Sequence, residues 1–180
     1  MNLPNKLTVL RVIMIPFFVY FVLVDPKSFN YRLIAEAIFI IASFTDLLDG
    51  KIARKYNLVT NFGKFMDPLA YKLLVSSALI CLLSIKSIPT WVVIVIIARE
   101  FIISGFRLVA ANNNIVIAAN QWGKWKTAMQ MAMIVVLILN IKNDIYMLLA
   151  NILIYVSAAL TVISLITYLA ANKDILKEQN

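Results

Sequence analysis

The chain has 180 residues, 62% of them hydrophobic, and its mean hydropathy is +0.88. A soluble domain is only about half apolar, so this composition predicts an all-α integral membrane protein. The formal net charge is +8, but no segment interleaves basic and aromatic residues as nucleic-acid modules do. We therefore expect no nucleic-acid partner and assign the positive charge to cytoplasmic loops and to a face near anionic membrane lipids.

A helix needs about 20 mostly apolar residues to cross a bilayer. Six segments meet this requirement and are separated by short connections, with no long linker or internal repeat. We predict six transmembrane helices in a single domain over residues 1–180, at 7–24, 32–52, 66–84, 88–110, 124–141 and 145–171.

The basic residues predict the orientation of these helices. With the N-terminus inside, most Lys and Arg residues lie near the cytoplasmic side, and the opposite side receives only Lys27, Arg32, Lys86 and Lys142. Since cytoplasmic loops carry the excess of basic residues, we expect both termini in the cytoplasm.

Three aspartates at the ends of two neighbouring helices are the first candidate site. Asp46, Asp49, Gly50 and Ala53 fall within about 100° of one another on a helix, and Asp67 begins the next helix. An ordinary solvated helix end would explain the acids but not the small residues beside them. The chain has no histidine and a single cysteine, so oxygen ligands are expected, which suit Mg²⁺ or Mn²⁺.

The small residues beside the acids would let a bulky anion approach the helix backbone. A diphosphate fits, because metal ions would screen its charge. Arg54 lies just beyond and could bind phosphate through two nitrogens, although the excess of basic residues on the cytoplasmic side offers a second explanation for it.

These residues resemble the signature of the CDP-alcohol phosphotransferases, D-x2-D-G-x2-A-R-x8-G-x3-D-x3-D. The match runs from Asp46 to Asp67 through every fixed position, and the six-helix prediction agrees with that family over the whole chain. The resemblance implies that two divalent metal ions bind Asp46, Asp49 and Asp67. It also implies that the cytidine diphosphate group of CDP-diacylglycerol is held by Asp49, Gly50, Ala53, Arg54 and Gly63.

Tyr71 stands where the signature has its fourth aspartate, the family's presumed catalytic base. A tyrosine side chain has an ordinary pKa of about 10, so it is a poor base and a poor Mg²⁺ ligand at neutral pH. Three interpretations follow: an altered form of an active enzyme, a natural variant with weak activity, or a protein that binds CDP-lipid without turning it over.

A second polar cluster occupies the fourth and fifth predicted helices. Arg99 and Glu100 interrupt an apolar run, Arg107 lies about 80° from Arg99 around the helix, and Lys124 and Lys126 begin the next helix. Arg99 and Glu100 could simply pair with each other. Several cations close to the metal site instead suit an acceptor that carries phosphate.

This cluster and the opening residues MNLPNKLTVLRVIMIPFF resemble the bacterial phosphatidylglycerophosphate synthases of the same family. The resemblance implies transfer of a phosphatidyl group from CDP-diacylglycerol to sn-glycerol 3-phosphate, which gives phosphatidylglycerol phosphate and CMP. Arg107, Lys124 and Arg99 are the candidates for the acceptor phosphate. Asn5, Thr8 and Arg11 are weaker candidates on the donor side, because helix capping and membrane orientation also explain them.

The resemblance further implies a homodimer in the bacterial cell membrane with its active site facing the cytoplasm. Three alternatives stay open: the same chemistry with another acceptor, such as an inositol phosphate or serine; a non-catalytic CDP-lipid binding protein; and a small transporter. The transporter is disfavoured because the polar residues gather at one face instead of tracing a path across the membrane.

Overall fold

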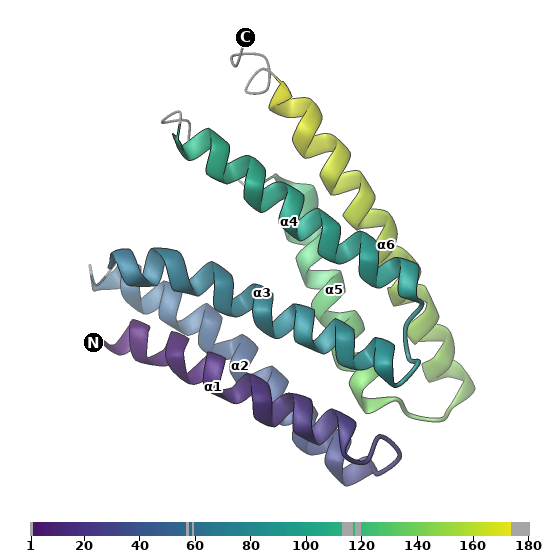
Figure 1. Cartoon of the computed structure of the whole chain (residues 1–180). Coiled ribbons are helices and arrows are strands. Elements are labelled where there is room, and N and C mark those ends of the chain that lie inside the picture. Colours follow the sequence, from purple (N-terminus) through teal and green to yellow (C-terminus); the bar gives the residue numbers. More distant parts are fainter. Residues whose placement is uncertain (1, 57, 59, 113–116, 118–119, 174–180) are drawn as a thin grey trace. The chain divides into compact units, whose positions relative to one another are not determined.

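A computed structural model describes residues 2–56, 58, 60–112, 117 and 120–173, and this part of the chain contains helices but no strand (Figure 1). The six-helix prediction is confirmed. The helices are α1 (Leu3–Leu23), α2 (Phe29–Lys55), α3 (Asn61–Ser84), α4 (Thr90–Asn112), α5 (Gln121–Leu139) and α6 (Asp144–Ala171).

Several helices begin earlier than the sequence predicted, because polar residues cap their first turns. The Thr60 side chain accepts a hydrogen bond from the Gly63 amide, so α3 starts at Asn61 instead of residue 66. Asn120 does the same for the Gly123 amide, and α5 starts at Gln121 instead of residue 124. A search for apolar runs misses these first turns, since capping residues are polar.

Three of the helices, α1, α3 and α6, are long and apolar enough to cross a membrane. Helix α4 carries Arg99, Glu100 and Arg107, α2 carries still more charged residues, and α5 opens on a polar turn. That these other three helices also span the membrane stays a prediction.

The chain divides into two compact units. The N-terminal unit contains α1, α2 and α3, together with Leu137–Leu139, and in it α1 packs on both α2 and α3. The rings of Phe18 and Phe39 lie 5.7 Å apart between α1 and α2. Buried alanines allow the backbones to approach closely, as is usual for helices in membranes: Ala35, Ala42, Ala70 and Ala78.

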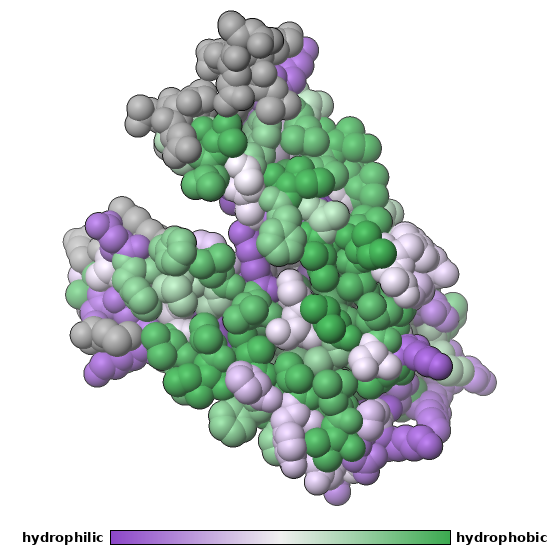
Figure 2. Space-filling view, viewed as in Figure 1, coloured by the Kyte–Doolittle hydropathy of each residue, from purple (hydrophilic) through white to green (hydrophobic). Residues whose placement is uncertain are grey.

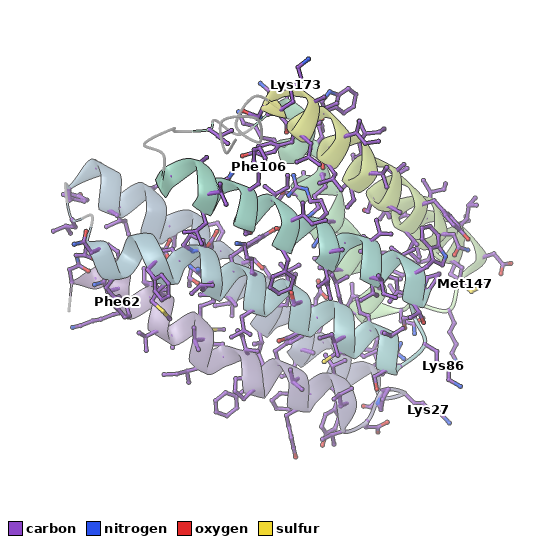
Figure 3. The ribbon with its side chains drawn as sticks, turned by 45° about the horizontal axis from the view of Figure 1, so that its top comes forward. Lys27, Phe62, Lys86, Phe106, Met147 and Lys173 are labelled. Atoms are coloured by element: carbon purple, nitrogen blue, oxygen red, sulfur yellow. The ribbon has the colours of Figure 1, made fainter. Side chains whose placement is uncertain are left out.

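The C-terminal unit contains the rest of the chain, with α4 packed on α6. Ile103, Phe106 and Ala110 of α4 form a buried cluster with Tyr168 of α6. The rings of Phe106 and Tyr168 meet edge to face at 6.0 Å. In Figure 3, Phe106 and Lys173 lie toward one end of this unit and Met147 lies toward the other.

Large apolar side chains cover much of the outer surface of both units (Figure 2). On α1 they include Ile13 and Phe17, and on α6 they include Ile152 and Ile166. An apolar surface of this extent suits contact with lipid chains and identifies a multi-pass membrane protein.

The alternating direction of the helices brings the start of α1, the end of α2 and the start of α3 to one end of the N-terminal unit (Figure 1). Phe62 lies at this end, and Lys27 and Lys86 lie at the other (Figure 3). The acid-rich segment therefore shares an end with the start of α1. Assignment of that end to the cytoplasm stays a prediction from the basic residues.

Candidate active site

Helix α1 contributes one polar stripe to the N-terminal unit. Asn5, Thr8 and Arg11 are spaced three residues apart, so they share one face of the helix, and all three are buried. The Arg11 side chain is fully buried. Burial of a guanidinium in an apolar helix is costly unless the group is paired. The contacts of Arg11 therefore indicate the role of this helix face.

Arg11 joins the two aspartates of α2. Its two terminal nitrogens donate to Asp46 Oδ1 at 2.6 Å and to Asp49 Oδ2 at 2.5 Å. Its Nε lies 3.2 Å from the Ala42 carbonyl oxygen and 3.4 Å from Thr45 Oγ1. The guanidinium therefore fixes the orientation of both carboxylates and offsets their mutual repulsion.

The same stripe holds the aspartate of α3. Thr8 Oγ1 donates to Asp67 Oδ1 at 2.6 Å. One turn before Thr8 on α1, Asn5 Oδ1 accepts a hydrogen bond from Thr60 Oγ1 at 3.0 Å. The same Thr60 side chain caps the start of α3. The polar stripe of α1 thus contacts the end of α2 and the start of α3, and it brings all three predicted aspartates to one end of the unit.

Gly63 lies on the first turn of α3 and faces Asn5 of α1. A Cβ atom at this position would meet Asn5 Oδ1 at 3.2 Å, Thr60 Oγ1 at 3.3 Å and Asp67 Oδ2 at 3.5 Å. The signature glycine therefore lets α1 and the first turn of α3 share this hydrogen-bond network.

We expect Gly63→Ala to lower activity by roughly tenfold or more, because the added methyl group displaces Asn5 or Thr60 of the hydrogen-bond network by a few tenths of an ångström. CMP release by purified protein measures the effect. Gly105→Ala is the matched control, because a Cβ there meets nothing within 4 Å. Equal activity of the two variants would show that the close approach at Gly63 is not needed.

The chemistry of the three aspartates suits a hard divalent cation, since such cations prefer oxygen ligands and carboxylates carry them. Asp46 is 29% exposed and Asp49 only 2%, so Asp46 is the more open to an incoming ion. Among the described residues, however, no three His, Cys, Asp or Glu side chains are arranged to hold one metal ion. Arg11 links the acids of α2 instead, and metal binding by Asp46, Asp49 and Asp67 stays a prediction.

The remaining residues assigned to the cytidine diphosphate group lie on the last turns of α2. Gly50 and Ala53 are partly exposed there, and the side chain of Arg54 lies outside the described residues. Tyr71 follows Asp67 by one turn of α3, so the structure places it on the same helix face, partly buried.

In the C-terminal unit, buried charges form a second cluster. Glu100 Oε1 accepts a hydrogen bond from the Lys126 ammonium and lies 3.5 Å from an Arg99 terminal nitrogen. Lys126 and Arg99 are both buried. The sequence suggested an Arg99–Glu100 pair, and the structure adds Lys126 of α5 as the closer partner of Glu100.

The two arginines of α4 both contact α6, which agrees with their expected placement on one side of the helix. Arg99 Nε donates to Ser164 Oγ at 3.2 Å, and Arg107 Nε donates to Tyr168 Oη at 3.0 Å. Lys124 is exposed on the first turn of α5. The assignment of Arg99, Arg107 and Lys124 to an acceptor phosphate stays a prediction.

The sequence contained little or no indication of the residues that support the two clusters. Arg11 and Thr8 ranked as weak candidates, yet they hold all three aspartates of the signature. Their three-residue spacing was the available signal, but capping and membrane orientation explained it equally well. Ser164 and Tyr168 carried no signal, because hydroxyl residues are common in membrane helices.

Comparison with known proteins identifies a family and several relatives of this chain. The family model of CDP-alcohol phosphatidyltransferase matches residues 1–163. The chain is 46% identical to the CDP-diacylglycerol–glycerol-3-phosphate 3-phosphatidyltransferase of Bacillus subtilis, over 99% of both chains. Proteins with the same name are 40% identical in Rickettsia bellii, over 96% of each chain, and 40% identical in Haemophilus influenzae, over 96% of this chain and 94% of the relative.

Proposed function

The chain belongs to the CDP-alcohol phosphatidyltransferase family, and we propose that it transfers a phosphatidyl group from CDP-diacylglycerol to sn-glycerol 3-phosphate, giving phosphatidylglycerol phosphate and CMP. The observation that carries this proposal is the 46% identity to the Bacillus subtilis enzyme over 99% of both chains. A match of that extent covers both units of the chain.

The contacts of the N-terminal unit support a site for a diphosphate held by metal. Asp46, Asp49 and Asp67 are the residues that would hold one or two Mg²⁺ or Mn²⁺ ions. When bound, such ions neutralise the diphosphate and stabilise the departing CMP. Arg11 and Thr8 orient the carboxylates, and Gly50, Ala53, Arg54 and Gly63 surround the cytidine diphosphate group.

The reaction exchanges one phosphorus–oxygen bond for another. An acceptor hydroxyl oxygen bonds to the phosphorus that carries diacylglycerol, the bond from that phosphorus to CMP breaks, and the hydroxyl proton passes to a base or to water. Arg99, Arg107 and Lys124 would hold the phosphate of the acceptor, since cations suit a dianion. Positioning and charge stabilisation then account for most of the rate enhancement.

The setting of this reaction is the bacterial cell membrane, with both termini and the acid-rich end of the N-terminal unit at the cytoplasmic face. The apolar outer surface supports the membrane location, and the distribution of basic residues supports the orientation. A homodimer is part of the proposal by family resemblance.

Choice of acceptor is the direct test of the proposed function. We expect CMP release from CDP-diacylglycerol with Mg²⁺ and glycerol 3-phosphate, at least about 100-fold less with serine or inositol phosphate, and none after chelation of the metal. Purified protein in mixed micelles supplies the measurement. Faster CMP release with another acceptor would identify that compound, and not glycerol 3-phosphate, as the substrate. Activity that survives chelation would refute the metal site.

A further inference from the structure

Two hydroxyl groups of α6 each contact one arginine of α4. Ser164 Oγ accepts from Arg99 Nε at 3.2 Å, and Tyr168 Oη accepts from Arg107 Nε at 3.0 Å. Ser164 and Tyr168 are four residues apart, so they share one face of α6. The two contacts follow the same order along both helices, and all four residues belong to the C-terminal unit.

Both contacts use the same nitrogen of the guanidinium. A hydrogen bond at Nε sets the plane of the group, and the two terminal nitrogens form a separate edge of the kind that binds a phosphate through two parallel bonds. In Arg99 one terminal nitrogen also lies 3.5 Å from Glu100 Oε1. The hydroxyls therefore orient the two guanidinium groups without neutralising their charge, whereas Glu100 places a carboxylate beside Arg99.

Burial indicates that the hydroxyls are fixed supports. Ser164 is fully buried and Tyr168 is 2% exposed, and Ser164 Oγ also donates to the Thr161 carbonyl oxygen at 3.0 Å. The Arg107 guanidinium carbon lies 5.6 Å from the centroid of the Tyr168 ring. Arg107 Nε already donates to the Tyr168 hydroxyl, so we attribute the short distance between the guanidinium and the ring to this hydrogen bond.

We propose that Ser164 and Tyr168 are positioning residues of the acceptor site, which hold Arg99 and Arg107 in the orientation that binds the phosphate of the acceptor. The inference rests on the proposed function for the identity of that acceptor. Neither hydroxyl takes part in bond making, so the effect of losing them falls on acceptor affinity and leaves the affinity for CDP-diacylglycerol unchanged.

The test is the dissociation constant of sn-glycerol 3-phosphate for the full-length protein in detergent, measured by calorimetry, so that turnover is not needed. We expect Ser164→Ala and Tyr168→Phe each to raise it by roughly threefold to tenfold. Matched controls lie on the same helix and should bind like the parent protein. Ser157→Ala removes a buried hydroxyl that has no hydrogen-bond partner among the described residues, and Tyr155→Phe removes the hydroxyl of an exposed tyrosine.

A double variant separates positioning from a general effect on folding. Tyr168→Phe should add nothing to the loss caused by Arg107→Ala, because the hydroxyl acts only through that arginine. Unchanged thermal unfolding of Tyr168→Phe, which keeps its ring in the core, confirms that the fold is intact. Additive losses, or losses equal to those of the control variants, would overturn the proposal.

Failure of the proposed function gives a different result. If the parent protein binds inorganic phosphate but not glycerol 3-phosphate, and Ser164→Ala and Tyr168→Phe weaken that binding, the hydroxyls retain their role and the acceptor is wrong. If the parent protein binds glycerol 3-phosphate and the two variants bind it equally well, the inference is wrong and the function stands. If the parent protein binds neither anion, both fail.

Discussion

Tyr71→Asp is expected to raise the turnover of CDP-diacylglycerol with glycerol 3-phosphate by on the order of 100-fold or more, because a carboxylate at this position supplies a base for the acceptor hydroxyl. Tyr71 follows Asp67 by one turn of α3, so the new carboxylate joins the face that carries Asp67. The gain should appear in kcat more than in KM, since proton removal belongs to the chemical step.

Tyr71→Asn is the control for this experiment. Asparagine has the size and polarity of aspartate but cannot accept a proton, so it removes the bulk of the tyrosine without supplying a base. If both variants gain equally, the tyrosine acts by obstructing the site. If the parent protein already turns over as fast as Tyr71→Asp, the proton passes to water or to another acid, and position 71 is not the base.

A third outcome supports the binding-protein alternative. A protein that only binds CDP-lipid would retain metal-dependent binding of the nucleotide and would release no CMP even after Tyr71→Asp. Binding of CDP to the variant, measured beside CMP release, separates this outcome from a variant that has lost its fold.

Arg11→Met is expected to abolish CMP release and to destabilise the protein by about 3–5 kcal/mol, the usual cost of breaking a buried ion pair from one side. The guanidinium contacts Asp46 and Asp49 at 2.6 and 2.5 Å. Because Asp49 is buried, water has little access to replace the lost contact of its carboxylate. Thermal unfolding in detergent measures the loss of stability.

Arg11→Lys distinguishes the charge of Arg11 from its geometry. Lysine keeps the positive charge but lacks the fork that reaches two carboxylates together, so we expect partial stability with activity reduced by at least about tenfold. Lys6→Ala removes an exposed charge from the same helix and should have little effect on either measurement. Full activity of Arg11→Met would show that the aspartates do not depend on this residue.

The sequence by itself determined the helical membrane fold and the family. Apolar runs of bilayer length can form little else, because every backbone polar group in lipid must be paired within its own helix. The signature from Asp46 to Asp67 was also visible, since its spacing follows the helical repeat within α2 and α3. These features depend on residues near one another in the chain.

Only the tertiary structure decided which residues support the site. Arg11 meets Asp46 and Asp49 across 35 and 38 residues, and Thr8 meets Asp67 across 59. Tyr168 meets Arg107 across 61 residues. Helical periodicity fixes which face of its own helix a side chain occupies, but not which neighbouring helix covers that face. That choice depends on packing between helices, where small residues and buried charges decide which faces can meet.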